Sequence, residues 1–142
     1  MELEKLYHTT VEEKLGLKPD VEGLHKQLDI HDVWWDDEGR TYMQLRVTEQ
    51  TLNPFGSIHG GSIFTLCDMV AEACIVSKGR MGVTLDGNIH FFRPAALGSV
   101  LTAVAEERKD GRSTAVCLVT VRDEEERSIA EATFTLFYTD HQ

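Results

Sequence analysis

The chain alternates between strand-like and helix-like patterns of apolar residues. Six stretches with alternating or mostly apolar positions predict β-strands, and they cover residues 27–35, 41–48, 83–92, 99–108, 113–122 and 128–138. Residues 59–77, between the second and third of them, are apolar on nearly every side, which is typical of a buried helix. Residues 1–18 predict a short amphipathic helix. This order indicates an α+β fold with a largely antiparallel sheet around one long helix.

The connections carry turn residues. Residues 36–39 predict a hairpin turn between the first two strands, and Asn53-Pro54 with Gly56-Ser57 predicts a loop before the long helix. Residues 109–112 predict a tight hairpin turn because they contain Asp-Gly. We expect a single domain over residues 1–142, with residues 1–26 as a helical N-terminal extension. One such sheet covers the helix with one of its faces, and its second face needs another cover. A dimer is therefore expected.

Composition narrows the possible partners. The net charge of −10 argues against nucleic acid, which needs clustered Lys and Arg. No stretch of about 18 uninterrupted apolar residues predicts a membrane span, and the charged start lacks the apolar core of a signal peptide. A cytoplasmic protein is therefore expected. Three cysteines without a CxxC pair, Cys67, Cys74 and Cys117, indicate core residues rather than a metal site.

The long helix carries one polar strip. Ser62, Thr65, Asp68 and Glu72 fall within about 120° of its circumference. Two carboxylates on an otherwise apolar helix need a reason, because unpaired buried charge is costly. The strip is either a functional site, or a helix edge that reaches solvent or forms an ion pair.

The start of the same helix is a candidate anion site. Gly60 and Gly61 have no side chains, so the first N–H groups of the helix are open to an anion or a developing oxyanion, unless the glycines serve only close packing. Gly60 and Asp68 are eight residues apart, which is about 12 Å along one helix. If both act on one carbonyl group, Asp68 must come from a second copy, which predicts a dimer with two shared sites.

Several of these residues resemble a known family. Asn53, His59-Gly60-Gly61 and Asp68, followed by residues 82–86, 88–89 and 92–95, resemble the PaaI-like hotdog acyl-CoA thioesterases over roughly residues 27–140. The resemblance implies a hotdog fold, in which a curved antiparallel sheet wraps a long helix. It also implies hydrolysis of an acyl-CoA to a carboxylic acid and free CoA, without a metal or a cofactor other than the CoA of the substrate. Dimers of the family often pair into tetramers.

The resemblance also implies residue roles. Gly60 would donate its N–H to the thioester oxygen, and Asp68 of the other subunit would attack the carbonyl or activate water. Asn53 would position the water or the substrate, His59 would order the start of the helix, and Thr84 would lie near the attacking water. Each has a structural alternative: an Asx turn for Asn53, a helix cap for His59 and an ordinary strand position for Thr84.

The expected substrate contacts are Gly61, Glu72, Arg93 and Arg80. The two arginines are candidates for the CoA phosphates, with solvated turn charges as the alternative. Glu72 departs from the family, whose members usually have small or apolar residues there. It could line the acyl pocket, pair with a base or act on Asp68 as a like charge, and a polar acyl group such as a hydroxylated aromatic would suit it.

Three other functions fit parts of the same pattern. A hotdog enoyl-CoA hydratase or dehydratase would use a histidine and a carboxylate, but the Pro-rich segment expected around that histidine is missing. A non-catalytic acyl-CoA binding protein would hold the substrate without releasing thiol. A structural subunit would need only the helix pairing. The sequence does not identify the acyl group.

Overall fold

The structure is a computed structural model that describes residues 23–140, so the predicted helix over residues 1–18 lies outside the described residues. The described elements are, in chain order, α2 (Leu24–Gln27), β1 (Ile30–Trp35), β2 (Thr41–Arg46), the 3-10 helix η1 (Glu49–Thr51), α3 (Gly60–Ser77), β3 (Gly82–Phe91), β4 (Val100–Asp110), β5 (Thr114–Arg122) and β6 (Ser128–Tyr138). The predicted order of two strands, one long helix and four strands is confirmed. The short α2 and η1 were not predicted.

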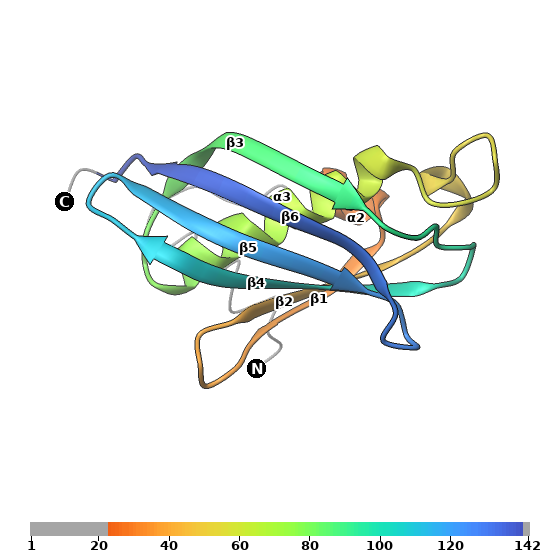
Figure 1. Ribbon diagram of the computed structural model, residues 1–142, viewed down its shortest axis with the longest axis horizontal. Helices are drawn as coiled ribbons and strands as arrows, with labels where there is room; N and C mark the ends of the chain where they lie inside the picture. Colours follow the sequence, from red (N-terminus) through yellow and green to blue (C-terminus); the bar gives the residue numbers. More distant parts are fainter. Residues whose placement is uncertain (1–22, 141–142) are drawn as a thin grey trace.

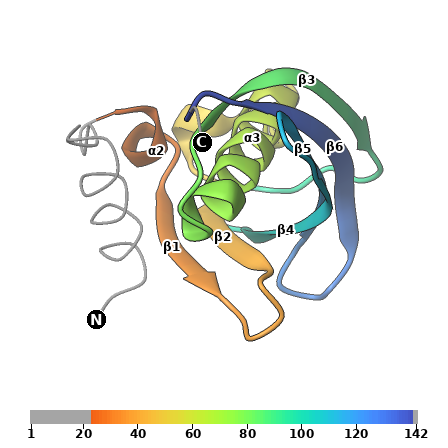
Figure 2. The same cartoon turned by 90° about the vertical axis from the view of Figure 1, so that its left-hand side faces the viewer.

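The six strands form one antiparallel sheet in the order β1-β2-β4-β5-β6-β3. The sheet curves around α3, as the two views in Figures 1 and 2 show, and the predicted hotdog fold is confirmed. Strand β3 pairs only with β6 and therefore forms one edge of the sheet, and β1 forms the other. The end of β3 lies beside the start of α3 (Figure 1), where the Phe91 ring meets Gly60.

The core lies between α3 and the concave face of the sheet. Strand β5 alternates buried and half-buried positions, and its buried side chains face the helix. Half of the α3 residues are buried: Ile63, Leu66, Cys67, Val70, Ala71, Ala73, Cys74, Ile75 and Val76. By length and composition alone α3 could cross a membrane, but a helix wrapped by its own sheet meets the same criterion as the core of the fold.

The turn between β4 and β5 lies further along the chain than predicted. The hairpin predicted around residues 109–112 is confirmed, but its turn lies further along, because β4 continues through Asp110 and the turn covers residues 111–113. Gly111 is not in the left-handed region there, and its N–H donates to the Thr114 carbonyl at 2.8 Å. The adjacent tryptophans of β1 point to opposite faces of the sheet: Trp35 packs against the core, and Trp34 stacks on Tyr42 with ring centroids 5.2 Å apart.

Candidate active site

A β-bulge in β3 determines which of its side chains face the helix. Thr84 pairs with Leu136 and Asp86 with Thr135, so Leu85 is an extra residue in the ladder. Before the bulge, the even-numbered Thr84 faces α3. After it, the odd-numbered positions do: a Cβ on Gly87 would lie 2.5 Å from Cε1 of Phe134, and the Phe91 ring covers Gly60. Without the bulge, Thr84 and Phe91 would lie on opposite faces of the sheet.

The bulge brings Thr84 to Asp68. The Thr84 hydroxyl donates to Oδ1 of Asp68 at 2.6 Å. Asp68 is half-buried and Thr84 is exposed, so the pair is open to solvent in a single chain. A carboxylate that accepts one hydrogen bond still has free lone pairs, and this bond fixes its orientation. Among residues 23–140 no hydrogen bond to Oδ2 is found, so this oxygen can meet a water molecule or a substrate carbon.

The start of α3 keeps one backbone donor free. His59 is the N-cap, and its Nδ1 accepts the Gly61 N–H at 3.1 Å. The Ser62 and Ile63 N–H groups donate to the His59 carbonyl at 2.9 and 3.4 Å. Within residues 23–140 no acceptor is found for the Gly60 N–H. This is the donor that the family resemblance predicts for the thioester oxygen. The positive end of the helix dipole would strengthen its interaction with an oxyanion.

Asn53 organises the loop before the helix. Its Oδ1 accepts the N–H groups of Phe55 and Ser57 at 2.9 and 3.2 Å, and its Nδ2 donates to the Ser57 hydroxyl at 3.0 Å. These bonds use the side chain within the turn 53–57, which is the Asx-type alternative to a role at the water. Phe55, at the tip of this turn, is 92% exposed.

A cavity of about 360 Å³ opens at the start of α3. Most of its lining is apolar, and Arg93 contributes the one charge: its residues are Ile58, Gly60, Ile63, Phe91, Phe92, Arg93 and Pro94. A Cβ on Gly60 would lie 3.1 Å from Cζ of Phe91, so a larger residue there would push the Phe91 ring outward by a few tenths of an ångström. The sequence missed Phe91 and Ile58 as site residues; two adjacent aromatic residues at the end of a strand were the available signal.

Glu72 lies one turn beyond Asp68 on the same strip. It is exposed, and in the described part of the chain no side chain forms a hydrogen bond or ion pair with it. Desolvation by the neighbouring protein, and then the charge of Asp68, raise the pKa of Glu72 above its usual range. Among residues 23–140, Glu72 therefore has no base as a partner.

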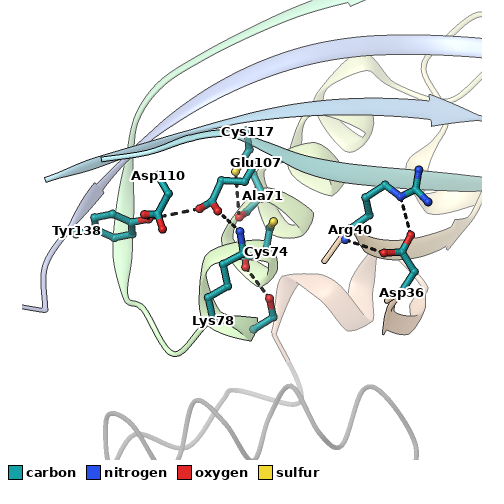
Figure 3. A network of polar contacts seen from close by, with 10 residues as sticks. Asp36, Arg40, Ala71, Cys74, Lys78, Glu107, Asp110, Cys117 and Tyr138 are labelled. Atoms are coloured by element: carbon teal, nitrogen blue, oxygen red, sulfur yellow. Dashed lines mark hydrogen bonds and ion pairs between the residues drawn. The ribbon is translucent and has the colours of Figure 1, made fainter. Parts of the chain in front are cut away.

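Arg80 lies at the opposite end of α3 from Gly60. It binds Asp140 through Nε at 3.2 and 3.1 Å and through Nη2 at 3.0 Å, and it lies over the Tyr138 ring at 3.6 Å. Beside it, Lys78 forms an ion pair with Glu107, and the Tyr138 hydroxyl donates to Asp110 at 2.6 Å (Figure 3). Arg80 is thus already paired within the chain, whereas Arg93 is exposed and lines the cavity.

The cysteines are buried away from this open face. Burial and the charge of Asp68 raise the pKa of Cys67 to about 12, so it is a thiol at neutral pH. Cys74 and Cys117 are also free and fully buried. Within residues 23–140 no group of three or more His, Cys, Asp or Glu residues could hold a metal ion.

The site residues form two groups within one chain. Gly60, Gly61, His59, Asn53 and Arg93 gather at the start of α3, where the cavity lies. Asp68 and Glu72 lie two to three turns further along the helix, on its open face, and Thr84 contacts Asp68 from β3. Asp68 and Gly60 are about 12 Å apart along the axis, so one chain cannot apply both to one carbonyl group.

Known proteins resemble this chain in sequence. Residues 55–130 match the family described as the thioesterase superfamily. Acyl-coenzyme A thioesterase PaaI of Escherichia coli (strain K12) is 34% identical over 94 residues, which cover 66% of this chain and 67% of that protein. Human acyl-coenzyme A thioesterase 13 is 32% identical over 79 residues. That match covers 54% of this chain and 56% of the human protein, little more than half of its length.

Solved structures resemble it in fold. A hypothetical thioesterase from Streptococcus pneumoniae TIGR4, solved with coenzyme A, has a TM-score of 0.73 and 35% identity over 76% of this chain and 87% of that chain. The E. coli PaaI protein has a TM-score of 0.78 and 28% identity over 93% and 95%. Variants of the S. pneumoniae protein with alanine in place of an aspartate, and of a threonine 16 positions later, have been solved. Asp68 and Thr84 have the same spacing.

Proposed function

The chain belongs to the thioesterase superfamily, and from this membership we propose that it hydrolyses acyl-CoA thioesters to a carboxylic acid and free CoA. The observation that carries the proposal is the Asp68 carboxylate, which the Thr84 hydroxyl orients at 2.6 Å on the open face of α3. A carboxylate in this position has a defined direction and a free oxygen, as a nucleophile or a general base requires.

A second copy of the chain completes the site. Strand β3 is a ten-residue sheet edge, and Val83, Leu85 and Phe91 are 54%, 61% and 50% exposed along it. An open edge with exposed apolar side chains favours pairing with another strand. Two copies paired antiparallel along β3 about a two-fold axis bring Gly60 of one to Asp68 of the other, and form two equivalent sites.

The reaction then uses groups from both copies. The thioester oxygen accepts the free Gly60 N–H of one copy. Asp68 of the other copy either attacks the carbonyl carbon or takes a proton from the water that attacks it. The C–S bond breaks, and CoA leaves as a thiolate, which is a good leaving group because of the low pKa of its thiol. Where Asp68 has attacked the carbonyl carbon, water then hydrolyses the acyl–Asp68 anhydride, which releases the carboxylic acid and restores the carboxylate. The developing oxyanion stays within reach of the N–H and the helix dipole.

The substrate contacts follow from the cavity and its charge. Arg93 is exposed on the cavity rim, which suits a phosphate of CoA. Arg80 is held by Asp140, so we do not assign it to the phosphates. His59 acts as the helix cap and Asn53 as the organiser of the preceding turn, and together they keep the Gly60 N–H in place.

The test is thiol release with Ellman's reagent over a panel of acyl-CoAs from acetyl to lauroyl, with benzoyl and phenylacetyl esters. We expect wild type to turn over at least one of them, and Asp68→Asn to lower kcat/KM by about 100-fold or more. Asp37→Asn, in the exposed turn between β1 and β2, is the matched control and should leave the rate unchanged.

Three outcomes overturn parts of the proposal. If wild type binds acyl-CoA but releases no thiol from any ester, the chain is a binding protein. Turnover of crotonyl-CoA without thiol release would indicate a hydratase. If Asp68→Asn and the control Asp37→Asn both keep the wild-type rate, the Asp68 carboxylate is not catalytic.

A further inference from the structure

The outer face of β3 carries an acidic and a basic side chain beside the free edge of the sheet (Figure 1). In the ladder with β6, Gly87 lies opposite the fully buried Phe134 and so faces the core. Asp86, Asn88 and His90 alternate with it and therefore point to the outer face. All three are exposed, and among residues 23–140 no side chain forms a hydrogen bond or an ion pair with them.

The backbone of β3 directs hydrogen-bonding groups to the same edge. The Phe92 N–H donates to the Ile129 carbonyl at 2.8 Å, so Phe92 is turned towards β6. Successive residues of a strand direct their N–H and C=O groups to opposite sides, so those of Gly87, Ile89 and Phe91 are directed away from β6. A strand that pairs with this edge bonds to these three residues. The residues between them, which carry the outer-face side chains, then occupy non-hydrogen-bonded positions, where opposing Cα atoms are only about 4.5 Å apart.

The shared site defines which residues of β3 meet when a second copy pairs along this edge, and the inference therefore rests on the proposed function. Thr84 is hydrogen-bonded to Asp68. The Phe91 ring lies over Gly60. A site that joins Asp68 of one copy to Gly60 of the other therefore places Thr84 opposite Phe91. Because the bulge removes one residue from the ladder count, Thr84 and Phe91 each lie three ladder steps from Asn88, and the two-fold axis passes through that position.

This register brings the two outer-face charges together. We propose that β3 pairs with β3 of a second copy with Asn88 on the axis, so that Asp86 of each copy binds His90 of the other. Side chains at directly opposed positions have Cβ atoms about 4.5–5.5 Å apart, and an imidazole N–H can donate to a carboxylate over that span. Within its own chain His90 lies opposite Glu131 of β6, and Asp86 lies opposite the uncharged Thr135. Each imidazole thus lies between two carboxylates in the dimer.

The positions of these charges select a second copy of this chain in one register. A shift of two residues in either direction leaves Asp86 and His90 opposite uncharged residues, and a shift of one residue places outer-face side chains opposite core-facing ones. The chain has a net charge of −10, so two copies repel each other as they approach. Two reciprocal pairs of opposite charge at the edge favour the correct contact locally.

The first experiment tests the register by disulfide formation between copies. Asn88→Cys places two thiols at directly opposed positions, and their Cα separation of about 4.5 Å lies within the range of a disulfide. We expect Asn88→Cys to give a covalent dimer on a non-reducing gel after oxidation by air with copper phenanthroline. Asp86→Cys and His90→Cys should each stay uncoupled alone and couple when mixed. Thr133→Cys, opposite Asn88 on β6, is the matched control, and the three native cysteines are buried.

The second experiment tests the charge pair by complementation. Asp86→Lys places a cation opposite His90, and His90→Glu places a carboxylate opposite Asp86. We expect each variant alone to raise the dissociation constant of the dimer, measured by analytical ultracentrifugation, by about fivefold or more, because two attractive contacts are lost in each dimer. A mixture of the two variants forms dimers with one pair of introduced opposite charges and one native pair. Its dissociation constant should return to within about threefold of wild type.

The inference is overturned if Asn88→Cys forms no covalent dimer although light scattering shows that the protein is dimeric, or if the mixture dissociates as readily as each variant alone. A wild-type chain that stays monomeric overturns it as well. Both experiments measure assembly and not turnover, so they separate the inference from the proposed function. A dimer that is coupled through Asn88→Cys, and whose wild type releases thiol from no ester, would overturn the reaction and support the register.

Discussion

The junction between α3 and β3 differs from the open face of α3 in how its polar groups are paired. Where α3 ends and β3 begins, three polar pairs form within the chain: Arg80 binds Asp140, Lys78 pairs with Glu107, and Tyr138 donates to Asp110. These six residues are the closing network. Desolvation and the bond to Asp110 raise the pKa of Tyr138, so it remains a hydrogen-bond donor at neutral pH.

On the open face, two polar groups have no partner among the described residues, although Thr84 binds Asp68 there. The Gly60 N–H and the Glu72 carboxylate have none among the described residues, and Val83 and Leu85 are more than half exposed. Polar groups at the junction are therefore satisfied within the chain, whereas those on the open face can bind a ligand or a second copy. We therefore expect changes on the open face to affect activity and assembly, and changes in the closing network to affect stability.

The largest expected effect comes from a charge on the edge of β3. Leu85→Asp places a carboxylate in the proposed contact between copies, where desolvation without a partner prevents close pairing. We expect monomers by size-exclusion chromatography with light scattering, an unchanged circular dichroism spectrum, and a loss of kcat/KM of at least about 100-fold, because each site needs both copies. Ser113→Asp, in the exposed β4–β5 turn, is the matched control. A fully active monomer of either protein would contradict the shared site.

A smaller effect is expected from the bond that orients Asp68. Thr84→Val keeps the shape of the side chain and removes the hydroxyl group, so the Asp68 carboxylate loses its 2.6 Å donor and can rotate. We expect kcat to fall by about 10-fold with little change in KM, which corresponds to the usual value of one hydrogen bond to a charged group. Thr84→Ser restores the donor and should recover most of the rate. Equal rates for Thr84→Val and wild type would show that Thr84 is only a strand residue.

The elements themselves could be predicted because their apolar patterns are long and regular. The buried side chains of α3 and the alternation of β5 are visible in the sequence, and thioesterase-superfamily membership was indicated by the residues around His59-Gly60-Gly61. The separation of Gly60 and Asp68 follows from helix geometry alone, since a rise of about 1.5 Å per residue holds for any α-helix. That part of the site needs no tertiary structure.

What could not be predicted depends on contacts between distant residues. The bulge at Leu85 changes the side-chain parity within one strand, and no local signal marks it, although it decides that Thr84 meets Asp68. The pairing of Arg80 with Asp140 joins residues 60 positions apart, and for that reason Arg80 looked like a free cation in the sequence. Glu72 was visible in the sequence, but its lack of a partner among residues 23–140 was not.

The smallest expected effect tests the closing network. Asp140→Asn weakens the bonds to Arg80 and to the Met81 N–H, which hold the start of β3. Arg80 lowers the pKa of Asp140 below 3.8, so the ionised form stabilises the fold above about that pH and this contribution is lost as pH falls through the lowered pKa. We expect Asp140→Asn to melt about 2–5 °C below wild type at pH 7, with a difference that shrinks towards pH 3, and with kcat unchanged. A loss of kcat with an unchanged melting temperature would mean that the network belongs to the site rather than to the frame that supports it.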